Sequence, residues 1–262
     1  MKFLMCRPEN YNINYEINPW MHIDVKANQA LALKQWENLY QTMQSCGAQI
    51  ELIPHATDWP DMTFTANAGM LYQGKIILAY FKHPERQGET PFFKNWFLKH
   101  GFDIVNPTDS TFAFEGAGDA LPAGDKLFVG YGFRSDPKFY QHLPIFNQHK
   151  LILCKLVDSY FYHLDTCYCP LDDNTGIWYP AAFSNESQEL MSQQMQLISV
   201  DIDEARQFAC NAVVINKQII IPSDCPKLTK DLVNLGYSVH TCDMSEFIKA
   251  GGACKCLTLR LD

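Results

Sequence analysis

Residues 69–81 read GMLYQGKIILAYF, two apolar runs separated by a short polar turn that contains Gly74. Apolar runs interrupted by Gly, Asn or Asp are typical of β-hairpins, because these residues adopt the turn conformations that join antiparallel strands. The last apolar run of the chain, KCLTLRL at 255–261, is expected to pair with KFLMCRP at 2–8. Further hairpins are predicted at 119–133 (DALPAGDKLFVGYGF), 166–183 (TCYCPLDDNTGIWYPAAF) and 211–224 (NAVVINKQIIIPSD).

Amphipathic stretches lie between these hairpins. NQALALKQWENLYQTMQSCG at 28–47 has apolar residues at helical spacing and ends at Gly47, a residue type that commonly terminates helices. Each stretch is followed by one more short apolar run, which predicts an additional strand. The other predicted helices lie at 90–101 and 227–236, which also end on Gly, and more weakly at 139–149 and 187–195.

The chain therefore repeats a unit of hairpin, helix and strand five times. No Ser/Gly-rich linker or change of composition divides it, so we expect a single domain over residues 1–262. Five such units can close as a pseudo-symmetric α/β ring, which leaves few open sheet edges.

Composition and charge exclude several classes of protein. Apolar residues make up 47% of the chain, enough for a sizeable core, and the net charge of −8 disfavours nucleic acid or an anionic membrane as a partner. We predict neither a secretory signal nor a membrane span, because no apolar run approaches about 20 residues. Ten cysteines diluted over 262 residues are more consistent with reduced thiols in the cytoplasm than with a disulfide framework.

One polar residue precedes each predicted hairpin at a nearly constant interval. The spacing is 48 residues between the first four positions and 45 residues before the fifth. In a ring of equal units, equivalent positions converge near the axis, so these side chains are expected to share one pocket. The five positions are Asn67, Glu115, His163, Asn211 and Cys256.

These residue types suit covalent chemistry on a cationic substrate. A neighbouring positive charge lowers the pKa of a cysteine thiol toward a usable thiolate. Carboxylates hold a planar guanidinium by paired hydrogen bonds, and Glu115, Asp119 and Asp165 are candidates for this role. His163 is expected to protonate a departing nitrogen and then to activate water. Cys256 is the predicted nucleophile.

The chain resembles the guanidine-modifying enzyme superfamily, which includes arginine deiminase, dimethylarginine dimethylaminohydrolase, amidinotransferases and arginine dihydrolase. The resemblance implies a five-bladed α/β propeller, the pentein fold, and hydrolysis of a guanidino substrate without a cofactor or a catalytic metal. The segments that carry it are YEINPWM (15–21), PDMTFTANAG (60–69), FEGAGDAL (114–121), GYGFRSD (130–136), YHLDTCYCPL (162–171) and GGACKCLTLRL (251–261).

The resemblance also implies roles for individual residues. Cys256 matches the family nucleophile, His163 the general acid and base, and Glu115 the acidic partner of the histidine or guanidinium. Asp165 matches a guanidinium ligand and Arg134 an arginine that binds the substrate carboxylate. Further residues expected at the substrate site are Asn18, Phe64 and Asn67, whereas Asp119 serves equally well as a loop-stabilising residue.

Asn67 separates branches of the family. Arginine deiminases carry Asp at this point, whereas the FTAN form is similar to arginine dihydrolases, which convert arginine to ornithine, ammonia and carbon dioxide. An amide offers a hydrogen-bond donor to a neutral ureido intermediate, which a carboxylate does not. Dimethylarginine dimethylaminohydrolase, deiminase and amidinotransferase activities remain alternatives at this stage.

A different class of protein is a zinc-binding, non-catalytic one. CYC at 167–169 and CKC at 254–256 supply sulfur ligands, and His163 is close in sequence to the first. The C-x-C spacing is not the usual C-x₂₋₄-C of structural zinc sites, and alternation on a strand also places both thiols on one packed face. We therefore expect no metal, a small-molecule guanidino substrate as the partner, and leave open a homo-oligomer and the role of Cys254.

Overall fold

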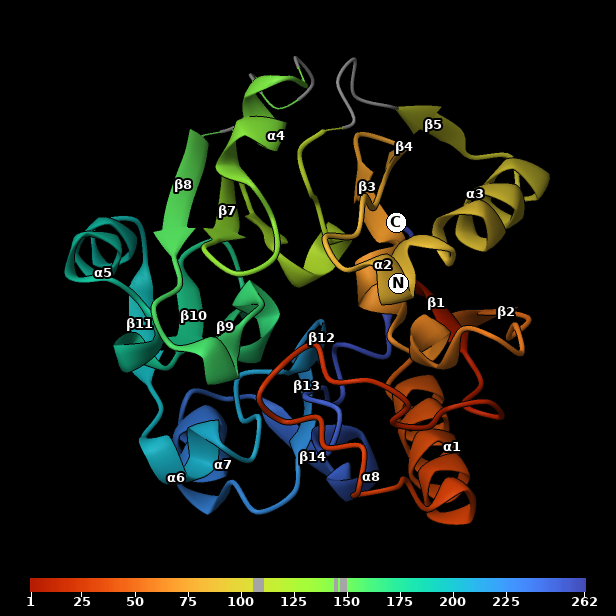
Figure 1. Ribbon diagram of the computed structural model, residues 1–262. Coiled ribbons are helices and arrows are strands. Elements are labelled where there is room, and N and C mark those ends of the chain that lie inside the picture. The colour runs from red at the N-terminus through yellow and green to blue at the C-terminus, as the bar shows by residue number, and fades with distance from the viewer. Residues whose placement is uncertain (106–110, 144–145, 147–149) are drawn as a thin grey trace.

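The computed structural model describes residues 1–105, 111–143, 146 and 150–262. Within these residues the strands form five three-stranded sheets, and in each sheet the first two strands are antiparallel and the third is parallel to the second. Sequence units of hairpin, helix and strand thus become the blades of a pseudo-symmetric five-bladed α/β propeller (Figure 1). This confirms the predicted ring.

Each hairpin lies where the sequence predicts it. The first strands of the blades are β3 (Gly69–Tyr72), β6 (Ala120–Ala123), β9 (Tyr168–Pro170), β12 (Val213–Ile215) and β15 (Leu259–Arg260). The second strands are β4 (Lys75–Leu78), β7 (Lys126–Tyr131), β10 (Thr175–Trp178), β13 (Gln218–Pro222) and β1 (Lys2–Cys6). The third strands are β5 (Asp103–Val105), β8 (Lys150–Lys155), β11 (Gln196–Ser199), β14 (Ser238–Cys242) and β2 (Gln49–Ile53).

The two ends of the chain close the ring. β15 pairs antiparallel with β1, with Phe3 opposite Arg260 and Leu4 opposite Leu259. β1 in turn pairs with β2 in parallel. The last strand therefore completes the blade that begins the chain, as the sequence pattern predicts.

A helix lies outside the sheet between the second and third strand of each blade, whereas the short α6 (Ile202–Ala205) and α8 (Ser245–Ile248) each follow a third strand (Figure 1). Helix α1 begins after Asn28, whose side chain accepts a hydrogen bond from the Leu31 amide, and its apolar face packs on the core through Trp36 and Leu39. The predicted helix at 139–149 is the short α4, and residues 144–145 and 147–149 lie outside the described residues. The helices are α1 (Gln29–Ser45), α3 (Thr90–Lys99), α4 (Pro137–Gln141), α5 (Asn185–Ser192) and α7 (Pro226–Asn234), with shorter α2 (Pro84–Gln87), α6 (Ile202–Ala205) and α8 (Ser245–Ile248).

The first strands of all five blades surround a cavity of about 210 Å³ on the axis of the ring. Its walls include Leu71 of β3, Leu121 of β6, Tyr168 of β9, Val213 of β12 and Leu259 of β15. The polar residue that precedes each first strand is consequently delivered to the axis. No helix in the described part of the chain is long and apolar enough to cross a membrane.

Candidate active site

The five regularly spaced polar residues meet at the axis. The Asn67 amide nitrogen donates to the Glu115 backbone carbonyl over 3.1 Å, and Glu115 Oε2 lies 2.7 Å from His163 Nε2. Across the axis, Asn211 Nδ2 lies 3.1 Å from Cys256 Sγ. All five side chains are buried. Residues that are 45 or 48 positions apart in sequence thus form one cluster.

A tight turn and a backbone hydrogen bond hold Glu115 in place. It directly precedes the 3-10 turn Gly116–Gly118, where Gly116 has a φ of +63°. A Cβ at Gly116 would lie 2.6 Å from the Gly69 carbonyl oxygen, so only glycine allows the two blades to approach this closely. The Glu115 amide donates to Ser135 Oγ over 2.9 Å.

Glu115 forms an ion pair and a hydrogen bond at one oxygen. Oε2 accepts from Arg134 Nη1 at 2.9 Å and lies against His163 Nε2. Burial alone would raise the pKa of the Glu115 carboxyl, but the Arg134 guanidinium and the hydrogen bond from His163 hold it well below its usual range. Because a carboxylate can only accept, His163 Nε2 donates the hydrogen bond between them.

Asp119 accepts hydrogen bonds from the segments that flank the site. Its Oδ2 accepts from Ser135 Oγ at 2.6 Å, and its Oδ1 accepts from the Leu164 amide at 3.0 Å, next to His163. Asp119 is not among the residues that line the small cavity described below. This geometry favours the loop-stabilising alternative for Asp119 over direct contact with a substrate.

Cys256 is positioned by Asn211. The Asn211 side-chain oxygen accepts from the backbone amides of Lys255 and Cys256, at 2.9 and 3.1 Å, while its nitrogen points at the sulfur. The oxygens of Asp165 lie 3.7 and 3.8 Å from Sγ. Burial and the Asp165 charge raise the pKa of the Cys256 thiol, and Lys255 and Asn211 oppose this shift.

Arg86 is a buried charged residue that the sequence reasoning missed. Its Nη1 donates to Asn67 Oδ1 at 2.9 Å, and its Nε and Nη2 donate to the two oxygens of Glu89 at 2.8 and 2.9 Å. Arg86 follows Asn67 by 19 residues, and Arg134 follows Glu115 by the same 19. This repeated offset of 19 residues is the sequence signal from which Arg86 could have been identified.

Asp61 was missed as well. It is 3% exposed, and its Oδ2 accepts from the Tyr15 hydroxyl at 2.9 Å, while Oδ1 has no hydrogen-bond partner among the described residues. Burial raises the pKa of the Asp61 carboxyl, and Arg86 and Tyr15 oppose the shift. The residue lies in the quoted segment 60–69, but nothing in its local sequence separates it from an ordinary turn aspartate.

A small cavity of about 10 Å³ lies between Cys256 and His163. It is closed by the segment around Asn18, whose amide nitrogen donates to the Ala250 carbonyl at 3.0 Å. Three of the predicted site residues do not line this cavity: Glu115, Asp119 and Asp165. The lining residues are Ile17, Asn18, Asp61, Phe64, Asn67, Arg86, Arg134, Tyr162, His163, Ala250, Gly252 and Cys256.

Arg134 already has partners at both terminal nitrogens. Nη1 donates to Glu115 and Nη2 donates to the Ile17 carbonyl at 2.8 Å, and its guanidinium lies 4.5 Å from the Tyr162 ring centroid. Its predicted contact with a substrate carboxylate stays a prediction. Because Ile17 belongs to the closing segment, movement of that segment would free one nitrogen of Arg134.

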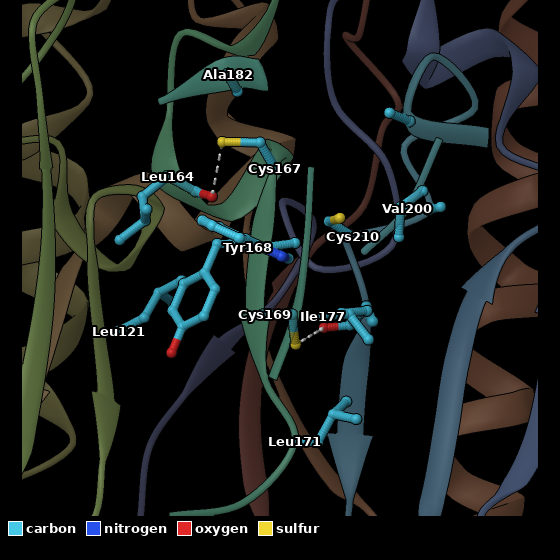
Figure 2. Close-up of a cluster of buried hydrophobic side chains, with 14 of the residues drawn as sticks. Leu121, Leu164, Cys167, Tyr168, Cys169, Leu171, Ile177, Ala182, Val200 and Cys210 are labelled. Carbon is cyan, nitrogen blue, oxygen red and sulfur yellow. Dashed lines mark hydrogen bonds between the residues drawn. The ribbon is translucent and has the colours of Figure 1, made fainter. Parts of the chain in front are cut away.

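The paired cysteines of the CYC segment belong to the core. Figure 2 shows Cys167 and Cys169 among Leu164, Tyr168 and Leu171, all within one hydrophobic cluster. The Cys167 thiol donates to the Leu164 carbonyl, and all ten cysteines are free thiols. Within the described ranges, no group of three or more His, Cys, Asp or Glu side chains is arranged to hold a metal ion. The zinc-binding alternative has no support.

Comparison with known proteins gives consistent matches over the chain. The family described as N,N dimethylarginine dimethylhydrolase, eukaryotic, matches residues 3–261. The bifunctional arginine dihydrolase/ornithine cyclodeaminase ArgZ of Synechocystis sp. is 42% identical over 268 residues, which is 100% of this chain and 38% of that protein. This chain therefore spans well under half of that relative.

Two further matches cover most of both chains. The N(G),N(G)-dimethylarginine dimethylaminohydrolase of Mycobacterium tuberculosis is 34% identical, over 99% of this chain and 85% of that protein. A crystal structure of the N-terminal domain of ArgZ bound to substrate superposes with a TM-score of 0.94 at 40% identity. It covers 99% of this chain and 97% of that one, and it is described as an arginine dihydrolase from the ornithine-ammonia cycle in cyanobacteria.

Proposed function

The chain belongs to the N,N dimethylarginine dimethylhydrolase family, and we propose that residues 1–262 form one catalytic domain with cysteine-dependent arginine dihydrolase activity. The observation that carries this proposal is the arrangement of the Cys256 thiol, the His163 ring and the Asn67 amide around one small cavity. The identity with ArgZ supports the choice of arginine. The overall reaction converts arginine and two waters to ornithine, carbon dioxide and two molecules of ammonia.

The amino-acid end of arginine finds complementary groups at the same cavity. The free oxygen of buried Asp61 suits the α-ammonium, because a buried carboxylate oxygen without a partner is stabilised by a cation. Arg86 and Arg134 line the same cavity, and Nη2 of Arg134 becomes available to an α-carboxylate once the Ile17 carbonyl moves away. Asn18, on the segment that closes the cavity, adds an amide. Since the cavity holds about one water, this segment moves to admit the substrate.

The first hydrolysis uses Cys256 as the nucleophile. Its thiolate forms a bond to the guanidinium carbon, the bond to one terminal nitrogen breaks, and His163 supplies the proton with which ammonia departs. Asp165 does not line the closed cavity, but its oxygens lie beside the sulfur and place negative charge next to the guanidinium that the sulfur attacks. Water deprotonated by His163 then adds to the thiouronium carbon, the carbon–sulfur bond breaks, and bound citrulline results.

The second hydrolysis repeats these steps on a neutral ureido group. One hydrogen of the Asn67 amide nitrogen is taken by the Glu115 carbonyl, and the other is available to the ureido oxygen. The thiolate attacks again, ammonia leaves, and water releases a carbamate of ornithine that decomposes to ornithine and carbon dioxide. Every group named belongs to the chain or is water.

Hydrolysis of dimethylarginine is the second candidate, favoured by the family match and the Mycobacterium tuberculosis relative. One assay separates the two. Purified protein is incubated with arginine, dimethylarginine, agmatine or citrulline, and products are identified by mass spectrometry. We expect ornithine and ammonia from arginine, and no turnover by Cys256→Ser. Citrulline as the sole product would exclude the dihydrolase, and full activity of Cys256→Ser would exclude the mechanism.

A further inference from the structure

Lys255 immediately precedes the nucleophile, and the proposed mechanism does not use its side chain. Its ammonium lies 3.0 Å from Asp165 Oδ2 and also donates to the Ala117 carbonyl. The side chain is 15% exposed and lines the axial cavity of about 210 Å³, on the opposite side from the small substrate cavity. Lys255 and Asp165 both line this axial cavity, and neither lines the small substrate cavity.

Asp165 connects this cation to the reacting sulfur. Its carboxylate is 2% exposed and faces Cys256 Sγ at 3.7 and 3.8 Å. When Cys256 is a thiolate, two negative charges lie side by side in a buried site, which is unfavourable unless positive charge accompanies them. The charged and titratable groups that face Cys256 are Asp165 and Lys255, with Asp61, Arg86, Arg134, Tyr162 and His163 across the small cavity and the Cys254 thiol behind.

The other cations near the sulfur are already balanced. Arg86 is paired with Glu89, and Arg134 is paired with Glu115. In the first hydrolysis, the guanidinium of arginine brings one more positive charge to Asp165. In the second, the ureido group of citrulline is neutral. The charge that the substrate supplied at first is therefore missing when the thiolate must form again.

We propose, on the basis of the dihydrolase activity proposed above, that Lys255 is the positioning residue that makes the second hydrolysis possible. Its ammonium balances the charge of the Asp165 carboxylate and holds that carboxylate in place beside Cys256 while a neutral ureido group occupies the site, so that a Cys256 thiolate is stabilised a second time. In that step the sulfur bonds to the ureido carbon, the carbon–nitrogen bond breaks, and ammonia leaves with a proton from His163. Lys255 does not touch the substrate and transfers no proton.

Removing the Lys255 charge has unequal effects on the two cycles. Without the ammonium, the Asp165 charge faces the Cys256 sulfur unopposed, so the thiol loses its proton only at higher pH. Bound arginine places its own positive charge beside Asp165 and Cys256, so the thiolate still forms during the first hydrolysis. Bound citrulline carries a neutral ureido group and supplies no positive charge there. Loss of Lys255 therefore slows the first hydrolysis modestly and the second severely.

The test compares Lys255→Met, Lys255→Gln and Lys255→Arg with the unsubstituted chain. Citrulline and ornithine formed from arginine are quantified over time by mass spectrometry. In the two neutral variants we expect arginine consumption within about tenfold of the parent and ornithine formation reduced at least about a hundredfold, with citrulline released. Lys255→Arg keeps the charge and should recover most ornithine. Lys227→Met, which removes an exposed lysine paired with Asp201, is the matched control and should behave as the parent.

A second measurement does not depend on turnover. The rate at which iodoacetamide alkylates Cys256, followed by peptide mass spectrometry across pH, should move to higher pH by at least about one unit in both neutral variants. An unchanged ornithine-to-citrulline ratio in Lys255→Met and Lys255→Gln would overturn the inference, as would an unchanged alkylation profile. If the parent itself forms no ornithine, the dihydrolase proposal fails, and the alkylation profile alone then decides whether Lys255 controls the thiolate.

Discussion

The variant Asn67→Asp exchanges one buried NH₂ group for an oxygen and adds a negative charge. In the parent, the amide nitrogen donates to the Glu115 carbonyl over 3.1 Å, and the amide oxygen accepts from Arg86 over 2.9 Å. The aspartate keeps the second contact and turns it into an ion pair. It loses the first contact, because a carboxylate oxygen then faces the Glu115 carbonyl oxygen.

The cost to the fold is small because these terms oppose each other. A buried carbonyl that loses its donor costs about 1–3 kcal/mol, and a hydrogen bond that becomes charge-assisted returns about 1 kcal/mol. The expected net loss of about 1 kcal/mol corresponds to about 2–4 °C in the midpoint of thermal unfolding for a chain of this size. The variant should therefore fold, so that its activity can be interpreted.

The effect on the reaction should be confined to the second hydrolysis. A guanidinium has donors for a carboxylate at position 67, so arginine consumption should stay within about threefold. A ureido oxygen needs a donor, and losing one hydrogen bond worth about 1–3 kcal/mol slows its hydrolysis by about 5-fold to 150-fold. Time courses of citrulline and ornithine by mass spectrometry measure this partition. Asn67→Ala removes the donor without adding charge, and wild-type ornithine yield in both variants would refute the reasoning.

Three further substitutions test the buried charges. The pKa of Glu115 is below its unfolded value near about 4.3, so Glu115 contributes stability above that pH and loses it on acidification; urea unfolding of Glu115→Gln should therefore vary less between about pH 5 and about pH 3 than that of the parent. Burial raises the pKa of Glu89 to about 7, so Glu89→Gln removes the countercharge of the buried Arg86 guanidinium above that pH and should lower the free energy of unfolding at about pH 8.5 by about 3 kcal/mol; a change under about 1 kcal/mol contradicts this account. Ser135→Ala removes the hydroxyl between Asp119 and the Glu115 amide, and it should cost about 1–3 kcal/mol with a displaced pH profile for arginine turnover, since the histidine loop loses its support.

The fold could be predicted from the sequence because its signals are local. Period-two apolar runs around Gly74 or Asn216, and helical runs that begin after a capping residue such as Asn28, specify strands and helices one unit at a time. The equal spacing of units then indicates a ring. The pairing of β15 with β1 follows, because the last unit lacks two strands and the first lacks one.

The site was only partly predictable, because burial is not visible in a single sequence. Arg86 and Asp61 belong to residue types that usually lie at the surface, and no local motif marks them as 3% exposed. Asn211 occupies a repeated position, yet its role depends on contacts with the Lys255 and Cys256 amides that only the closed ring creates. The contacts of Asp119 with Ser135 and with the Leu164 amide likewise depend on the folded ring and could not be read from the sequence.

Comparison of two neighbouring blades explains how the fold accommodates a neutral residue at position 67. An arginine follows the polar position by 19 residues in both blades and donates to it in both. In one blade that position is Glu115, which itself balances the arginine, and the residue 22 positions after it is Pro137. In the other blade the polar position is Asn67, and the residue at the same offset is Glu89, which binds the guanidinium through two oxygens. Each blade thus pairs one buried arginine with one buried glutamate. In the second blade the glutamate stands at a position other than the regularly spaced one, so Asn67 can line the cavity with a neutral amide while Glu89 balances the charge of Arg86.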